Sequence, residues 1–463
     1  MNNTPREEID ALVARQKAYF ATGATLPIAF RRDMLRRFES AVKTWEDAIC
    51  QALWTDLHKS REEAYLTETS IVLGEIRTAL RKVGRWSRRE WKMPKMAVLP
   101  SMSYVVKEPL GTALIVSPWN YPVQLLLSPL VGALAAGCTA VLKPSPYVPH
   151  VSQVIADMVQ QTFPSEYVAV VQGNREVNAH LFSHPFDLIF YTGSPAVAHT
   201  VMEAAARHLT PVILELGGKS PCIIDRTANI EVAAKRIAWA KTLNSGQTCI
   251  APDYILIHSE VKEAFIQAFA RQMQVLHGGD IQQSGHYVRM VSDRAFQRVS
   301  SYLQQGRIRY GGRTDAQQRF IEPTLLDQVP LDAPVMTEEI FGPIFPMITL
   351  DDQDRSFADQ VKAFVKARPK PLALYYYGRE KSGWDIIRHT SSGGACLNDS
   401  IMHIVNPHTP FGGVGNSGMG RYHDRESFEA FTHRRSVLVS PTWIDLPFRY
   451  MPYRLFSLVK HLV

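Results

Sequence analysis

A single cysteine, Cys249, stands in the stretch NSGQTCIAP, which spans residues 244–252. A cysteine that only packs in a core is normally surrounded by apolar side chains, whereas this one follows a run of small polar residues. Gly246 within that run would let a ligand approach the backbone closely. The thiol is therefore a candidate nucleophile, although the stretch alone also allows a packed cysteine. A nucleophile would need a donor for the oxyanion that it creates and a base for later hydrolysis.

Two other segments carry side chains that could supply those functions. Glu215 ends an apolar run and precedes a glycine pair, so partial desolvation would raise its pKa toward that of a useful general base. The alternative is a carboxylate at a strand end that pairs with Lys219. Asn120 lies between two prolines in PWNYP, where a rigid backbone could aim its amide at developing negative charge. Asparagine beside proline is also ordinary turn chemistry.

A third segment indicates nucleotide binding. Gly193 and Ser194 follow an apolar run directly, and Pro195 suits the first position of a helix. Free N–H groups at such a helix start could hold a pyrophosphate, although the sequence is not the G-x-G-x-x-G motif. Lys143 follows another apolar run and would lie at the edge where parallel sheets bind ligands. The alternative is a surface lysine at a strand end.

Composition narrows the class of protein. The chain has 463 residues, of which 46% are hydrophobic and 21% charged, which is typical of a globular protein with two or three domains. Its five cysteines are scattered, and none forms a C-x-x-C pair or joins histidines at zinc spacing, so we expect neither a disulfide scaffold nor a metal site. The start shows no signal peptide, and no apolar stretch is long enough to span a membrane. These features favour a cytoplasmic protein.

The net charge of +7 is modest for this length, although a basic stretch at residues 81–95 concentrates much of it. Such a stretch is usually a solvated face, and we expect no nucleic-acid partner. The end of the chain, residues 452–463, could place Leu455, Val459 and Leu462 on one helical face. We expect this tail to dock on the protein's own surface or on a partner subunit rather than on a membrane.

The hydrophobic pattern predicts the elements that must position these residues. Apolar residues at helical spacing predict a helical layer up to about residue 91. Five short apolar runs then alternate with amphipathic stretches over residues 111–218, which indicates a parallel sheet covered on both faces. A second α/β domain is predicted to begin near Gly217. Residues 393–421 are rich in Gly, Asn, Ser and His, and predict a functional loop without regular elements.

Seven motifs occur in an order and spacing that resemble the aldehyde dehydrogenase superfamily. They are PWNYP, KPS, YTGS, LELGGKSP, NSGQTC, EEIFGP and PFGGVGNSGMGRYH. The resemblance covers almost the whole chain and is strongest to the class 3 branch. It implies an α/β fold with a Rossmann-like cofactor domain, an α/β catalytic domain and a small bridging or oligomerisation β element. The implied boundaries are residues 1–88 and 111–216 for the cofactor-binding domain, 217–410 for the catalytic domain, 89–110 and 421–445 for the bridging segments, and 446–463 for a tail.

The resemblance also implies a role for each motif residue. Cys249 matches the nucleophile, Glu215 the general base, and Asn120 the oxyanion-hole amide, which acts with the Cys249 backbone N–H. The residues that match cofactor contacts are Lys143 at the adenosine ribose, Gly193 and Ser194 at the pyrophosphate, and Glu339 and Phe341 at the nicotinamide ribose, with Ser145 and Trp119 as further cofactor-binding residues. Tyr121 and Trp239 match aromatic residues of the substrate tunnel.

The implied activity is oxidation of an apolar aldehyde, aromatic or medium- to long-chain aliphatic, to its carboxylic acid with NAD or NADP. The Cys249 thiolate adds to the aldehyde, hydride transfer leaves a thioester, and water activated by Glu215 releases the acid. We expect a homodimer, as in dimeric members of class 3. The alternatives are a CoA-acylating dehydrogenase, which Glu215 disfavours, and a non-catalytic structural protein that retains the fold.

Three positions depart from the family pattern. Pro146 stands where the family usually has a glutamate that grips the ribose hydroxyls. Proline cannot accept that hydrogen bond, and the missing carboxylate no longer repels a 2′-phosphate, so we expect NADP to be accepted. Ala198 replaces the second glycine of the usual helix start, which predicts tighter or shifted pyrophosphate packing. Asp424 stands where class 3 relatives often have glycine, and the sequence assigns it no effect.

Overall fold

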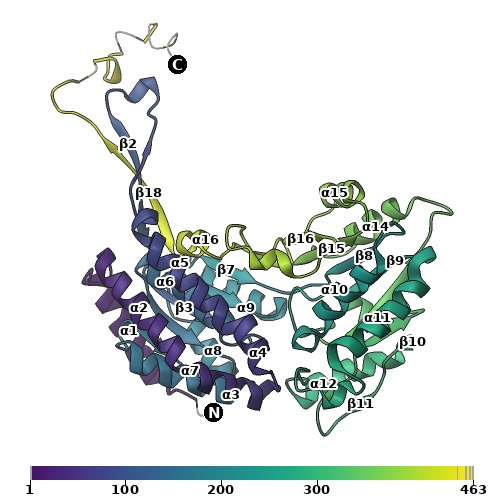
Figure 1. Ribbon diagram of the computed structural model, residues 1–463. Coiled ribbons are helices and arrows are strands. Elements are labelled where there is room, and N and C mark those ends of the chain that lie inside the picture. The colour runs from purple at the N-terminus through teal and green to yellow at the C-terminus, as the bar shows by residue number, and fades with distance from the viewer. Residues whose placement is uncertain (1–2, 446, 454–455, 458–459, 461–463) are drawn as a thin grey trace.

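Figure 1 shows the computed structural model, which describes residues 3–445, 447–453, 456–457 and 460. Two bodies, each built around its own sheet, lie side by side, and a narrow arm of strands extends from the first of them. The tail residues Leu455, Val459 and Leu462, for which we predicted a helical face, lie outside the described residues. Among the helices that are described, none combines the length and apolar character that a membrane span requires.

The first body contains the parallel sheet that the sequence predicts. Its six strands run in the order β17-β7-β6-β3-β4-β5, and all are parallel except β17. Their bounds are Thr112–Val116 for β3, Thr139–Lys143 for β4, Val168–Val170 for β5, Leu188–Thr192 for β6, Val212–Glu215 for β7 and Gly418–Met419 for β17. All five predicted strands form. Their carboxyl ends share one edge, where Asn120, Lys143, Gly193 and Glu215 follow or end four of them.

Alternation along each strand explains why helices cover both faces of this sheet. In β3, Ala113 and Ile115 belong to one core cluster, whereas Leu114 and Val116 belong to another, because successive side chains point to opposite faces. The first cluster includes residues of α2 (Ile28–Thr44), α3 (Glu46–Leu57), α5 (Ser70–Trp86), α6 (Gln124–Ala136) and α7 (Pro149–Thr162). The second includes residues of α1 (Arg6–Ala21), α8 (Arg175–Phe182) and α9 (Pro195–Ala206). The predicted N-terminal helices therefore divide between the two faces, with α2, α3 and α5 on one and α1 on the other.

The second body has a seven-stranded sheet in the order β10-β13-β14-β9-β8-β15-β16, parallel except for β10. The strands are β8 (Pro221–Ile224), β9 (Tyr254–His258), β10 (Arg307–Tyr310), β13 (Thr324–Asp327), β14 (Ile344–Leu350), β15 (Ala373–Tyr377) and β16 (Gly394–Leu397). Its helices are α10 (Ile230–Thr242), α11 (Lys262–His277), α12 (Asp293–Ser301), α13 (Pro334–Thr337), α14 (Phe357–Lys366) and α15 (Glu380–His389). Two further strands, β11 (Thr314–Asp315) and β12 (Phe320–Ile321), pair with each other.

The prediction that residues 393–421 hold no regular elements is wrong at both ends of that segment. Strand β16 pairs in parallel with β15, and β17 adds an antiparallel edge to the first sheet opposite Glu215. Glycine and alanine are poor strand formers, so the local sequence of β16 gives no strand signal. The strand forms because its backbone hydrogen-bonds to β15, which precedes it in the chain, and a prediction from local residue propensity cannot include such a contact.

The arm is a three-stranded antiparallel sheet in the order β1-β2-β18 (Figure 1). Its strands span Glu90–Lys92, Met102–Pro109 and Thr432–Val439, and the short helix α16 (Arg425–Ala430) leads into the last of them. Pairing between β2 and β18 joins segments more than 300 residues apart. The chain returns from the second body to the first at β17, and β18 then continues into the arm beside β2.

Candidate active site

The Cys249 turn leaves α10 through a strained backbone. After Thr242 a short 3₁₀ turn spans Leu243–Gly246, and φ is positive at Asn244 (50°), Ser245 (54°) and Gly246 (71°). A Cβ at Gly246 would lie 2.4 Å from the carbonyl oxygen of Gly342. Gly246 is thus required by the chain's own packing, which corrects the expectation that it leaves room for a ligand. Strain of this kind persists only where surrounding contacts fix the backbone.

Those contacts are buried side-chain amides. The Asn244 side chain donates to the carbonyl oxygens of Asn120 and Gln247, each at 3.0 Å. The Gln247 side chain donates to the carbonyl oxygen of Arg289 at 3.1 Å and accepts from the Val291 N–H at 3.1 Å. The residues directly before Cys249 are therefore hydrogen-bonded both to the first body and to the loop after residue 288. These bonds fix the position of the backbone that carries the thiol.

Asn120 reaches this turn from the loop after β3. Its side chain is buried, and its Nδ2 donates to the Gln247 carbonyl oxygen at 3.0 Å. A primary amide has two N–H groups, so this bond orients the side chain and leaves the second N–H as a donor. The neighbouring Tyr121 is also buried, and its hydroxyl lies 2.7 Å from the Thr248 Oγ1. Two consecutive residues of the PWNYP motif therefore touch the two residues that precede the cysteine.

A fully buried ion pair clamps the loop that carries Asn120. Lys59 and Glu68 have side chains with 0% exposure, and Lys59 Nζ lies 2.6 Å from Glu68 Oε1. The same Nζ donates to the Asn120 carbonyl oxygen at 3.1 Å. The other carboxylate oxygen of Glu68 accepts the Val123 N–H at 2.8 Å and the Gln124 N–H at 3.2 Å. A charge pair buried this deeply is stable only when further hydrogen bonds satisfy both groups, and here the loop backbone supplies them.

Glu215 ends β7 with a carboxyl group that has no partner. The residue is 3% exposed, and among the described residues neither carboxyl oxygen has a hydrogen-bond partner. Burial raises the pKa of this carboxyl well above its usual value. The alternative pairing with Lys219 is not formed, because Lys219 contacts Asp253 instead. A buried, unpaired carboxyl group has a structural cost that only a function explains.

Two nearby carboxyl groups affect the pKa of the Cys249 thiol. Burial, and after it the negative charges of Glu339 and Glu215, raises the pKa of the thiol to about 12. Glu339 also holds the glycine pair after Glu215: its Oε1 accepts the Gly218 N–H at 2.9 Å, and a Cβ on Gly217 would lie 2.3 Å from it. Burial raises the pKa of Glu339 to about 8. At neutral pH the isolated thiol is therefore protonated.

The predicted cofactor residues follow the carboxyl edge of the first sheet. Lys143 is buried rather than on the surface, its Nζ donates to the Pro144 carbonyl oxygen at 2.8 Å, and burial lowers its pKa to about 8. Ser145 next to it is also buried. Ser194 precedes α9 without a side-chain cap bond, and Gly193 is crowded by the Tyr191 ring, with a would-be Cβ 2.2 Å from the hydroxyl. These groups fit a cofactor, since the buried amine has no acidic partner among the described residues.

The last predicted residues divide into two groups. Trp119 and Phe341 meet edge to face with ring centroids 5.4 Å apart, which places both motifs at the same end of the site. Trp239, by contrast, lies 37% exposed on α10, and its role in a tunnel stays a prediction.

Three residues depart from the family pattern in the sequence. Pro146 is exposed, Ala198 of α9 packs in the core, and Asp424 pairs with Lys82 at 3.0 Å.

Sequence reasoning missed the residues behind the motifs. Four such residues contact the turn or loop of a predicted site residue: Lys59, Glu63, Glu68 and Gln247. The Glu63 carboxylate, for example, accepts the Asn244 N–H at 2.8 Å. One signal was available for the first three. They are charged residues within a stretch whose periodicity predicts buried helices, and charged residues in such positions are rarely buried unless they are paired.

Comparison with known proteins agrees with this site. The aldehyde dehydrogenase family profile matches residues 1–437. A Staphylococcus aureus protein named 4,4′-diaponeurosporen-aldehyde dehydrogenase is 44% identical over 95% of both chains. A mouse protein named aldehyde dehydrogenase, dimeric NADP-preferring, is 41% identical over 93% of this chain and 94% of its own. The solved structure of a substrate-bound state of Staphylococcus aureus AldH has a TM-score of 0.95 and 43% identity, and covers 100% of this chain and 99% of its own.

The chain belongs to the aldehyde dehydrogenase family. It is an oxidoreductase that uses NAD or NADP, and it has the α/β fold with two parallel-sheet bodies that the resemblance implied. The resemblance to the class 3 branch is confirmed, because relatives named as family 3 members match as well, among them human family 3 member B1 at 41% identity over 92% of this chain and 90% of its own.

Proposed function

We propose that this protein oxidises an apolar aldehyde, aromatic or medium- to long-chain aliphatic, to its carboxylic acid through a thioester on Cys249. One observation supports the hydrolytic outcome: Glu215 is buried with no hydrogen-bond partner in the described part of the chain, and its negative charge contributes to the raised pKa of the Cys249 thiol. A dehydrogenase that passes its acyl group to CoA has no need of such a base. The Staphylococcus aureus relative is named for an aldehyde substrate, which supports an aldehyde as the substrate class here.

The proposed chemistry begins at the Cys249 sulfur. Loss of its proton to solvent water produces the thiolate that adds to the aldehyde carbon, and the carbonyl oxygen becomes an oxyanion. The second N–H of Asn120 and the Cys249 backbone N–H stabilise that oxyanion. NAD(P)⁺, when bound, would supply the hydride acceptor, and loss of hydride from the substrate carbon would re-form the carbonyl as a thioester on Cys249. Glu215 then takes a proton from water, which attacks the thioester carbon and releases the acid.

The proposed cofactor contacts follow the sheet edge in order. Lys143 and Ser145 hold the adenosine ribose, the Gly193–Ser194 turn holds the pyrophosphate at the start of α9, and Glu339 holds the nicotinamide ribose with Trp119 and Phe341 beside it. Tyr121 and Trp239 line the path of the aldehyde. The buried amine of Lys143 and the free helix start support the first two assignments. The predicted domain boundaries at residues 88, 111, 216 and 410 remain part of this proposal.

NADP should be accepted as well as NAD. Pro146 is exposed after Lys143, so no carboxylate at that position opposes a 2′-phosphate. We expect kcat/KM with NADP to be within about tenfold of the NAD value or above it. Pro146→Glu should shift preference toward NAD, whereas Tyr147→Glu, at the next exposed residue, should shift it less. An NADP efficiency more than about tenfold below that of NAD in the wild type would refute the prediction.

The Lys59–Glu68 pair should matter to catalysis through Asn120. Lys59→Met removes the donor to the Asn120 carbonyl oxygen and leaves Glu68 buried without its partner, so we expect a hydride burst about a hundredfold slower. The KM for the cofactor should change little, which a general loss of structure would not produce. Lys59→Arg should restore part of the rate. Lys262→Met, which breaks the Lys262–Asp327 pair in the second body, is the matched control. Equal effects of the two methionine variants would contradict the positioning role.

We further propose a cytoplasmic homodimer in which the β1-β2-β18 arm bridges the subunits. The arm extends beyond the first body, and the mouse relative is named as dimeric. A flat edge strand left in solvent is prone to pair with another chain, and a partner subunit would cover it. Light scattering should give twice the 52.1 kDa mass of the chain, and a monomer at micromolar concentration would count against the arm's role.

The activity itself is tested by NAD(P)H formation. The purified protein should reduce each cofactor with benzaldehyde, cinnamaldehyde and aliphatic aldehydes of increasing chain length, with efficiency rising along the aliphatic series. Addition of CoA should not change the product from the free acid. A protein inactive on every aldehyde with both cofactors would revive the structural-protein alternative, and an acyl-CoA product would favour the acylating one.

A further inference from the structure

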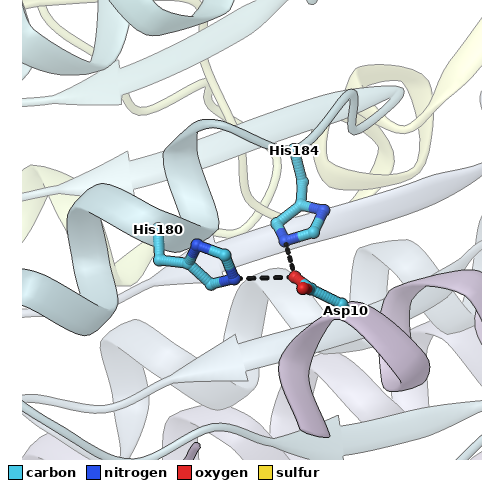
Figure 2. Close-up of side chains that lie close together, drawn as sticks. All are labelled: Asp10, His180 and His184. Atoms are coloured by element: carbon cyan, nitrogen blue, oxygen red, sulfur yellow. Dashed lines mark hydrogen bonds and ion pairs between the residues drawn. The ribbon is translucent and has the colours of Figure 1, made fainter. Parts of the chain in front are cut away.

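Three side chains outside the active site converge at one point of the first body. Figure 2 shows Asp10 of α1 facing His180 of α8 and His184 just after that helix. His180 Nε2 lies 2.7 Å from Asp10 Oδ1, and His184 Nε2 lies 3.0 Å from the same oxygen. Each of the three residues offers one ligand atom, and these three atoms lie within 4.8 Å of one another. The proposed catalytic chemistry uses none of them.

The histidine and aspartate side chains of this cluster differ in how far they are buried. The imidazoles of His180 and His184 are only 19% and 17% exposed, whereas the Asp10 side chain is 54% exposed. His184 Nε2 is buried, and the Asp10 carboxylate oxygen at 3.0 Å is the polar group that it faces. Both imidazoles thus turn a nitrogen toward one carboxylate oxygen, and a cation held among the three atoms would be bound by all of them. The open side at Asp10 gives such an ion a path from solvent.

The chemistry of the three groups suits a transition metal. Imidazole nitrogens are common ligands of transition-metal ions in proteins. Two imidazoles and one carboxylate are a ligand set that Zn²⁺ prefers, and three protein ligands leave a fourth position for water. The His-x-x-x-His spacing brings both rings to one side, as their edge-to-face contact at 5.0 Å shows.

We propose that Asp10, His180 and His184 form a binding site for a divalent transition-metal ion, with zinc as the first candidate. The ion would join α1 to α8, two helices on the same face of the sheet that share one core cluster. Lys17, on the same helix as Asp10, donates its amine to the Pro185 carbonyl oxygen and is not a ligand. The site would be structural, since it ties the first helix of the chain to the body that holds the cofactor edge.

The site can be tested by zinc titration of the full-length protein. Cys249→Ala should be the background for every measurement, so that the active-site thiol cannot bind the ion. Calorimetry should give one zinc ion per chain, and saturating zinc should raise the Tm. Asp10→Asn and His184→Gln remove a ligand, and we expect each to weaken binding at least about a hundredfold and to abolish the rise in Tm.

Two control variants distinguish binding at this site from binding at other histidines or thiols. His389→Gln changes an exposed histidine that pairs with Asp385 alone, and should leave zinc affinity unchanged. Cys396 lies 3.3 Å from His403 and could bind zinc through its thiol, so Cys396→Ala should also leave affinity unchanged. Cobalt should bind without a thiolate charge-transfer band. Loss of binding only in the Cys396 variant, or equal affinity of the Cys249→Ala protein with and without Asp10→Asn, would overturn the proposal and leave a hydrogen-bonded His–Asp–His triad.

Discussion

Replacement of the proposed nucleophile, Cys249→Ala, should reduce NAD(P)H formation by at least about ten-thousandfold with every aldehyde. In the proposed reaction the sulfur bonds to the substrate, and alanine has no group that could form the thiohemiacetal. The fold should survive, because the turn is held by Asn244 and Gln247 rather than by the thiol. Steady-state spectrophotometry measures the loss, and cofactor binding measured by fluorescence should be close to that of the wild type.

A second cysteine serves as the control for this variant. Cys396→Ala removes another thiol of the second body and should leave kcat within about twofold of the wild type. The raised pKa of Cys249 also predicts the direction in which alkylation of the thiol depends on pH. Since that pKa is about 12 in the free protein, the thiolate fraction and the rate of alkylation should rise through the whole accessible alkaline range, about tenfold per pH unit. Substantial turnover by Cys249→Ala would place the covalent step on another group.

The sequence determined the outline of the site because its motifs follow strands. Each predicted strand of the first sheet forms, and in a parallel sheet the residues after successive strands must meet at one edge. Asn120, Lys143, Gly193 and Glu215 follow or end such strands, so periodicity alone brings them together. The polar run before Cys249 also signalled a special turn, although the reason for Gly246 is the carbonyl of Gly342 and not a ligand.

What the sequence did not predict depends on contacts between distant segments. Lys59 reaches the Asn120 carbonyl across 61 positions, and no local pattern reports that distance. The same limit applies to the metal proposal. We expected no metal site because no cysteine joins histidines at zinc spacing, yet Asp10 stands 170 positions before His180, and only the packing of α1 against α8 reveals the cluster.

The second large effect should come from Glu215→Gln. The first half of the reaction uses Cys249 and Asn120, so rapid mixing should still show a burst of NAD(P)H close to one equivalent per active site. Hydrolysis of the thioester then lacks its base, and steady-state turnover should fall by about a hundredfold to ten-thousandfold. Acid quenching during turnover should trap the acyl group on Cys249, where mass spectrometry can detect it.

The pH dependence of deacylation is a second test of Glu215 as the general base. Burial raises the pKa of the Glu215 carboxyl, so its protonated form persists to higher pH than for an exposed glutamate, and the base form appears only as pH rises through the raised value. Deacylation in the wild type should therefore accelerate with pH over that range, whereas Glu215→Gln should lose this acceleration.

Glu339→Gln is the informative comparison, because Glu339 is also close to the thiol but holds the glycine pair at the proposed cofactor end. That variant should weaken cofactor binding and slow the burst while deacylation keeps its pH dependence. If Glu215→Gln lost the burst and Glu339→Gln lost deacylation, the two carboxylates would have to exchange roles. If neither variant accumulated acyl-enzyme, hydrolysis would not limit turnover, and the unpaired burial of Glu215 would have to serve a step other than deacylation.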